Sequence, residues 1–112
     1  MHFHGNAETV DDSAHLAELL GDAGAAALLT VDFRGYGWST GTPALSALTA
    51  DAEAVHDALP QLLAQYGLAD GRPVLVYGRS LGSVCAVHIV ARACRGGGQV
   101  RELAPPAAAR RR

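Results

Sequence analysis

The strongest candidate for chemistry is the serine in the pentapeptide Gly78-Arg79-Ser80-Leu81-Gly82. A G-x-S-x-G segment between a strand and a helix is the sequence form of a nucleophile elbow. The sharp turn strains the backbone of Ser80 and lifts its hydroxyl clear of the sheet. Glycines at 78 and 82 let the strand and the helix pass close to the serine, because glycine has no Cβ. A serine presented in this way can attack the carbonyl carbon of an ester or an amide.

The segments on either side of this pentapeptide have the patterns that an elbow requires. Residues 73–77 form a short apolar run that predicts a buried strand, and residues 84–91 are apolar and long enough to predict a buried helix. The free N–H groups at the start of that helix would favour negative charge near Ser80. The N–H of Leu81 would be one of them, as an oxyanion-hole donor. Without these flanks, the motif could equally be an ordinary glycine-rich turn.

The rest of the chain alternates between short apolar runs and helical patterns. Residues 3–4 resemble the end of a strand, and residues 25–32 predict a buried parallel strand. Residues 12–23 and 44–66 have apolar side chains at helical spacing, although Pro60 should kink or restart the second helix. The predicted order is strand, helix, strand, helix, strand, helix. It indicates an α/β fold with a three-stranded parallel sheet, flanking helices and right-handed crossovers.

Length and charge indicate one small domain, or a piece of a larger one, with a basic tail. The 112 residues are 49% hydrophobic and have a net charge of −2. Residues 1–94 hold four arginines against ten acids, a balance of −6, whereas residues 95–112 hold five arginines against one acid, a balance of +4. The segment 95–112 lacks periodicity, so we predict a disordered tail. A basic tail could contact nucleic acid or an anionic membrane, but a solvated tail is the simpler interpretation, and we expect no nucleic-acid partner.

The two cysteines and the N-terminal residues provide evidence about the cellular compartment of the protein. Cys85 and Cys94 lie nine residues apart on the predicted helix, about 13 Å along its axis, which is too far for a disulfide. We predict that both are free and buried, which suits a reducing compartment. Residues 1–4 show no signal peptide, and no apolar run is long enough to span a membrane. A cytoplasmic location is therefore the default expectation.

Three motifs together resemble the α/β-hydrolase superfamily: His4-Gly5-Asn6-Ala7, the segment from Asp32 to Ser39 (DFRGYGWS), and the elbow pentapeptide. The chain looks closest to the abhydrolase-domain proteins grouped with serine aminopeptidase-like and monoacylglycerol lipase-like enzymes. The resemblance covers residues 1–94. It implies a partial α/β-hydrolase domain that runs from the third strand of the fold through the helix after the elbow. It also implies a serine hydrolase of the esterase, lipase or peptidase type, acting on a small ester, a lipid or an amide.

The resemblance assigns roles to matching positions. Ser80 matches the acyl-accepting nucleophile. Asn6 matches the residue whose backbone N–H is the second oxyanion donor, beside that of Leu81. We take His4 to shape the Gly5 loop by hydrogen bonding rather than to act as a base.

The remaining supporting positions are Asp32 and Arg34, which match a loop brace. We expect no cofactor, and no histidine pair has metal-ligand spacing with a supporting cysteine or carboxylate.

The chain departs from the superfamily after the elbow. The superfamily order is Ser, then Asp or Glu, then His, but only His88 and Glu102 follow Ser80. His88 lies eight residues along the same helix, about 12 Å from the serine, so it is predicted to be a buried helix histidine and not the base. Glu102 lies in the predicted tail. We therefore expect a chain that is inactive by itself and is complemented by the remainder of the fold.

Other interpretations remain open. A non-catalytic pseudoenzyme, or a module that binds a ligand or a partner, would also lack the base. Nucleotide binding is disfavoured because no phosphate-binding glycine motif follows a strand. His2 and His4 lie near the oxyanion loop, while His15 and His56 are predicted on the surface or at its boundary. Half a fold should leave a sheet edge unpaired and an apolar helix face uncovered, so we expect the isolated chain to aggregate.

Overall fold

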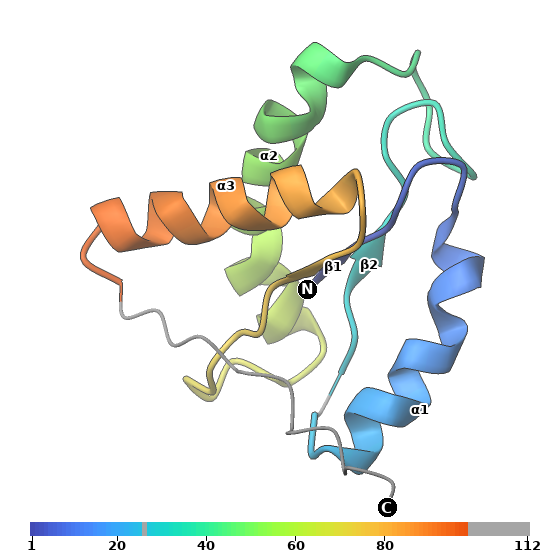
Figure 1. Ribbon diagram of the computed structural model, residues 1–112. Coiled ribbons are helices and arrows are strands. Elements are labelled where there is room, and N and C mark those ends of the chain that lie inside the picture. Colours follow the sequence, from blue (N-terminus) through green and yellow to red (C-terminus); the bar gives the residue numbers. More distant parts are fainter. Residues whose placement is uncertain (26, 99–112) are drawn as a thin grey trace, which may run out of the picture.

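The structure, a computed structural model, describes residues 1–25 and 27–98. Its sheet has three parallel strands, β1 (His2–Phe3), β2 (Thr30–Val31) and β3 (Tyr77–Gly78), in the order β2-β1-β3. The alternation of strands and helices along the chain confirms the predicted α/β fold with a parallel sheet (Figure 1). Of the predicted tail, residues 99–112 lie outside the described residues, so its disorder stays a prediction.

The two outer strands are shorter than predicted. Only Thr30–Val31 of the expected strand 25–32 is paired, and the expected strand 73–77 is replaced by pairing at Tyr77–Gly78. Both outer strands pair with the two residues of β1, so the length of the ladder is set by β1. Val74 and Leu75 are consequently exposed, and the prediction of a buried strand there is wrong.

The helices begin close to where the spacing predicts them. The first consists of a 3₁₀ turn, η1 (Val10–Ser13), followed by α1 (Ala14–Asp22). The second consists of a 3₁₀ turn, η2 (Leu45–Ala47), followed by α2 (Leu48–Gln65), which is one continuous helix across Pro60. The predicted restart at Pro60 therefore does not occur.

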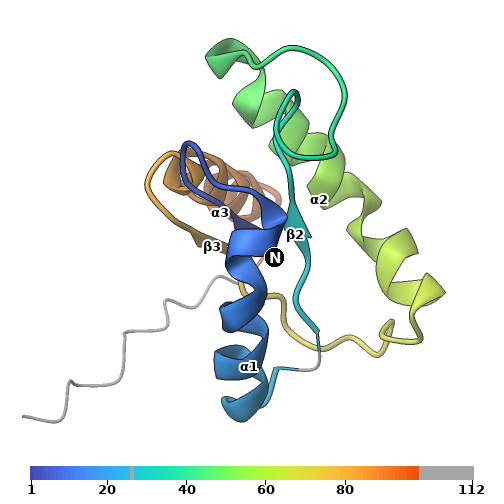
Figure 2. The same cartoon turned by 90° about the vertical axis from the view of Figure 1, so that its right-hand side faces the viewer.

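The third helix, α3 (Gly82–Arg95), anchors the core. It packs on α2, β1 and β3. Among the described elements α1 packs on η1 alone, and Figures 1 and 2 show α1 standing apart from the other two helices. One apolar cluster fills the interior, formed by Phe3, Phe33, Leu48, Ala52, Cys85, Ala86 and Ile89. The core therefore lies against α3, the helix that follows the elbow.

The cysteines are free, but only one of them is buried. Cys85 belongs to the core, as predicted. Cys94 is exposed, and the prediction that it is buried is wrong. It lies in the last turn of α3, at the end of the helix away from the elbow (Figure 1). Among residues 1–25 and 27–98, no helix has the length and apolar character needed to cross a membrane.

Candidate active site

The turn between β3 and α3 has the geometry of a nucleophile elbow. Ser80 is exposed and has a φ of +51°, one of two positive values among the non-glycine residues that the structure describes. Such a conformation costs of order 1–3 kcal/mol and persists only where the surroundings enforce it. Here β3 ends two residues before Ser80 and α3 begins two residues after it. The strain predicted at Ser80 is therefore present in the structure.

The two motif glycines allow this turn to form. A Cβ on Gly78 would overlap the carbonyl group of Gly82, and a Cβ on Gly82 would overlap the carbonyl group of Phe3. The first contact closes the elbow on itself. The second packs the start of α3 directly against the end of β1. Both glycines are therefore required by close approach of the backbone and not by a positive φ.

The loop after β1 lies beside the elbow, because the N–H of Arg79 donates to the carbonyl of Phe3 at 3.1 Å. The loop and the elbow thus leave neighbouring parallel strands at the same edge of the sheet. Within the part of the chain that the structure describes, the backbone N–H groups of Asn6 and Leu81 donate to no other group. Two free N–H donors on two adjacent loops are the components of an oxyanion hole.

The loop after β1 is tied to the segment after β2 through His4 and Asp32. His4 is fully buried, and its Nε2 lies 3.4 Å from Oδ1 of Asp32, which is also buried. Asp32 accepts the N–H of Val10 at 2.9 Å and that of Trp38 at 3.3 Å. A Cβ on Gly37 would overlap the Asp32 carboxylate. The carboxylate therefore joins both ends of the loop between β1 and η1 to the segment 32–38.

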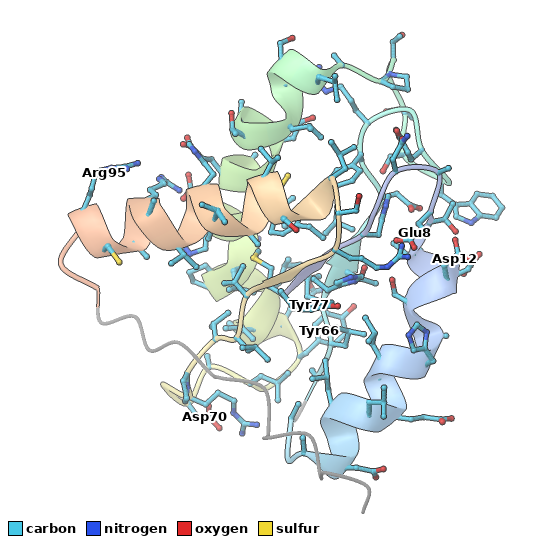
Figure 3. The ribbon with its side chains drawn as sticks, in the orientation of Figure 1. Glu8, Asp12, Tyr66, Asp70, Tyr77 and Arg95 are labelled. Atoms are coloured by element: carbon cyan, nitrogen blue, oxygen red, sulfur yellow. The ribbon has the colours of Figure 1, made fainter. Side chains whose placement is uncertain are left out.

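A second connection joins this loop to the elbow itself. The N–H of Gly5 donates to one carboxylate oxygen of Glu8 at 2.6 Å, and the other oxygen forms an ion pair with the guanidinium of Arg79. Figure 3 shows Glu8 beside the loop that leaves β1. The residue before the serine is thus tied, through Glu8, to the loop that carries Asn6.

The side chain of Asn6 is fixed as well. The hydroxyl of Tyr36 donates to Oδ1 of Asn6 at 2.7 Å. Tyr36 lies in the Gly-Tyr-Gly part of the segment after β2, so the same segment holds both His4 and Asn6. This contact orients the residue whose N–H is the candidate donor.

Arg34 connects the segment after β2 to α2. Its Nε donates to Oδ2 of Asp51 on α2 at 2.6 Å. This hydrogen bond lowers the pKa of Asp51 and raises that of Arg34. Arg34 therefore fastens the segment after β2 to α2.

None of the described histidines is hydrogen-bonded to Ser80. His88 is half-buried on α3, and its Nε2 lies 2.6 Å from Oε1 of Glu53 on α2, so the prediction of a buried residue is wrong. His2 contacts Thr30 and stacks on Tyr77. His15 is exposed and His56 half-buried, as predicted. In residues 1–25 and 27–98, no cluster of His, Cys, Asp or Glu could hold a metal ion.

Three contributors were missed by reasoning from the sequence: Glu8, Tyr36 and Arg79. Tyr36 and Arg79 lie inside the motifs, but the motifs alone do not indicate which residues these side chains contact. Glu8 lies outside every motif, but a lone acid four residues after His4 on a glycine-containing loop was a signal for a loop-closing hydrogen bond.

A comparison with known protein families identifies the family of this chain. The family described as serine aminopeptidase, S33 (Hydrolase_4) matches residues 1–109. The chain belongs to the serine aminopeptidase S33 family. Membership places the observed sheet and elbow in a partial α/β-hydrolase fold and confirms the resemblance to abhydrolase-domain proteins.

Individual members of this hydrolase family are similar over most of the chain. The lysophosphatidylserine lipase ABHD12 of Macaca fascicularis is 36% identical over 109 residues, which are 96% of this chain and 24% of that protein. The same lipase of Danio rerio is 31% identical over 96 residues, 84% of this chain and 23% of the relative. Protein bem46 of Schizosaccharomyces pombe is 28% identical over 92 residues, 82% of this chain and 29% of the relative. The chain thus spans about a quarter of the length of these relatives, and no solved structure matches it significantly.

Proposed function

We propose that this S33-family chain contributes the nucleophile and the oxyanion hole of a serine hydrolase that cleaves ester or amide bonds. The observation that supports this most directly is the positive φ of Ser80 at a turn closed by Gly78 and Gly82. Strain of this kind is retained where a function needs it. In this proposal residues 1–94 are a partial α/β-hydrolase domain.

The reaction would begin with attack of the Ser80 hydroxyl oxygen on the carbonyl carbon. A bond forms between these atoms, and the carbonyl oxygen gains negative charge, which the N–H groups of Asn6 and Leu81 would stabilise. Removing one such donor typically costs about 10²–10³ in rate. The serine proton needs a general base. Since no described histidine bonds to Ser80, a working site would take its base from outside residues 1–98.

The substrate proposed here is an ester with an apolar group. Two of the relatives named above are called lysophosphatidylserine lipases. In addition, a small cavity of about 150 Å³ adjoins Leu81. Most of its lining is apolar, with Phe33, Tyr36, Pro43, Ala44, Leu45 and Leu48 among its walls. We place the apolar group of the substrate in this cavity, next to the proposed oxyanion donor.

The test is a labelling experiment with a serine-reactive fluorophosphonate, followed by the intact mass of the native labelled protein. We expect label on Ser80, none on Ser80→Ala, and undiminished label on Ser46→Ala, which changes an exposed serine in η2. Label on a species heavier than the sum of this chain (11.6 kDa) and the label would identify the chain as a piece of a working hydrolase. A native species of this chain's own mass that takes no label would instead favour a non-catalytic ligand- or partner-binding module.

A further inference from the structure

The buried imidazole of His4 has contacts that a neutral ring does not satisfy. Its Nδ1 lies 2.9 Å from the carbonyl oxygen of Gly5, and a carbonyl can only accept, so Nδ1 carries a proton. In a neutral ring the other nitrogen would then be a bare lone pair. That nitrogen, Nε2, is buried, has no hydrogen-bond partner among the described residues, and faces Oδ1 of Asp32 at 3.4 Å. Two electron-rich atoms would face each other in an interior where repulsion is strong.

The contacts of Asp32 are those of an ionised carboxylate. It is 8% exposed. Its Oδ1 accepts the N–H of Val10, and its Oδ2 accepts the N–H of Trp38. Both oxygens thus accept backbone N–H groups, as an ionised carboxylate does. A buried carboxylate without a positive partner is costly, and Arg34, the nearest arginine in sequence, is paired with Asp51 instead.

We propose that His4 is held as an imidazolium in a buried ion pair with Asp32, and that this pair positions the Gly5–Asn6 loop against the elbow. The role of the pair in positioning the loop rests on the function proposed above. The assignment of a positive charge to His4 does not depend on that function. A proton on Nε2 turns the repulsive contact with Oδ1 into an attractive one. It also supplies the positive charge that the buried carboxylate lacks.

The surroundings of His4 favour this charge state. Its ring centroid lies 4.5 Å from that of Phe33 and 5.8 Å from that of Tyr36, in tilted pairs that fall within the range of about 6 Å for cation–π interactions. Other ionisable groups at the loop have partners of their own: Glu8 is bound to Gly5, Arg79 forms an ion pair with Glu8, and Asp12 accepts the N–H of Thr9. His2, on the same strand, has its pKa lowered by burial and then by the charge of His4, so it does not compete for the proton.

The pair would act on the site through the backbone. His4 holds the carbonyl of Gly5, while Asp32 holds Val10 at the far end of the same loop. The candidate donor Asn6 lies between these two anchors. Loss of the charge on His4 or on Asp32 would leave the other charge buried without a partner. The loop between β1 and η1 would then move so that water could reach that charge. His4 and Asp32 are therefore positioning residues rather than catalytic ones.

The experiment is nitrogen-15 NMR of the histidine rings in the native protein at neutral pH. We expect protons on both ring nitrogens of His4, and a single proton on Nδ1 in Asp32→Asn. The matched control is Glu53→Gln, which removes the ion pair between Glu53 on α2 and His88 on α3. This variant should leave the protons on the His4 ring unchanged. A neutral His4 ring in the unmodified protein would overturn the charge assignment, and this measurement requires no variant to fold.

Fluorophosphonate labelling tests the positioning. Asp32→Asn should slow the labelling of Ser80 by about 10-fold or more, a fraction of the loss expected when an oxyanion donor is removed. Glu53→Gln should change the rate less than about 2-fold. If the unmodified protein labels and Asp32→Asn labels equally fast, the positioning role is wrong. If Ser80 never labels although His4 has both protons, the proposed function fails and the ion pair stands.

Discussion

At the contact between the start of α3 and the end of β1, the Cα of Gly82 faces the carbonyl of Phe3 with no room for a Cβ between them. The same carbonyl of Phe3 accepts the N–H of Arg79. One peptide group of β1 therefore holds both sides of Ser80. Because the Gly5–Asn6 loop follows directly, this contact also fixes the distance between the two candidate oxyanion donors.

Gly82→Ala should destabilise the protein by about 1–3 kcal/mol, the usual cost of forcing extra volume into a packed site. The backbone of β1 would have to move to admit the methyl group. The control is Gly21→Ala in α1, where an added Cβ meets nothing within 4 Å. That change should be neutral or stabilising by about 0.5–1 kcal/mol. Urea denaturation measures both, and equal stability of Gly82→Ala and the unmodified protein would contradict the contact.

Ser80→Gly should be more stable than Ser80→Ala by about 1 kcal/mol, although both lose the hydroxyl. Ser80 has a φ of +51°, a conformation that glycine adopts freely and that alanine resists. The difference between the two denaturation midpoints reports the backbone strain without the side-chain chemistry. If alanine proved the more stable of the two, the strain at the elbow would be absent.

Tyr36→Phe should slow fluorophosphonate labelling of Ser80 several-fold, because it removes the hydrogen bond that orients Asn6. Its effect on the free energy of unfolding should be about 0.5–1.5 kcal/mol, the usual net contribution of one hydrogen bond. Tyr66→Phe is the control, since Tyr66 is exposed at the end of α2. Identical labelling rates for the two variants would show that Tyr36 does not support the donor.

Acid should weaken the attachment of the segment after β2 to α2. The hydrogen bond from Arg34 lowers the pKa of Asp51 below its ordinary value of 3.8. A depressed folded-state pKa contributes stability above the unfolded-state value, and that contribution is lost as the pH falls through the folded-state value. The stability of the unmodified protein should therefore fall more steeply below about pH 4 than that of Arg34→Gln. Parallel curves of denaturation midpoint against pH would refute this linkage.

The isolated chain should self-associate, because apolar side chains on two helices are uncovered. Leu19 on α1 is 62% exposed, and Val84 and Val87 on α3 are 51% and 68% exposed. Size-exclusion chromatography at micromolar concentration should show aggregates, and Val84→Thr combined with Val87→Thr should reduce them. A soluble monomer of the unmodified chain with one sharp unfolding transition would be the opposite result.

Much of the fold could be predicted from local patterns. Apolar periodicity located the helices at α1 and α2, and the run before Gly78 located the turn into α3, because these signals depend on near neighbours. The lengths of β2 and β3 could not be predicted, since a ladder exists only where a partner strand lies, and β1 offers two paired residues. Exposure of Cys94 and His88 likewise depended on where α3 extends beyond its neighbours.

The sequence by itself determined the chemistry that this chain can offer: a serine between two glycines, after an apolar run and before a helix, in an S33-family chain. The tertiary structure alone decided how that serine is supported. His4 meets Asp32, Asn6 meets Tyr36, and Glu8 meets Arg79, pairs separated by 28, 30 and 71 positions. The physical reason is that the spacing of residues in a motif reflects constraints on the local backbone. The charges and hydrogen bonds that hold a loop depend on which strands lie side by side.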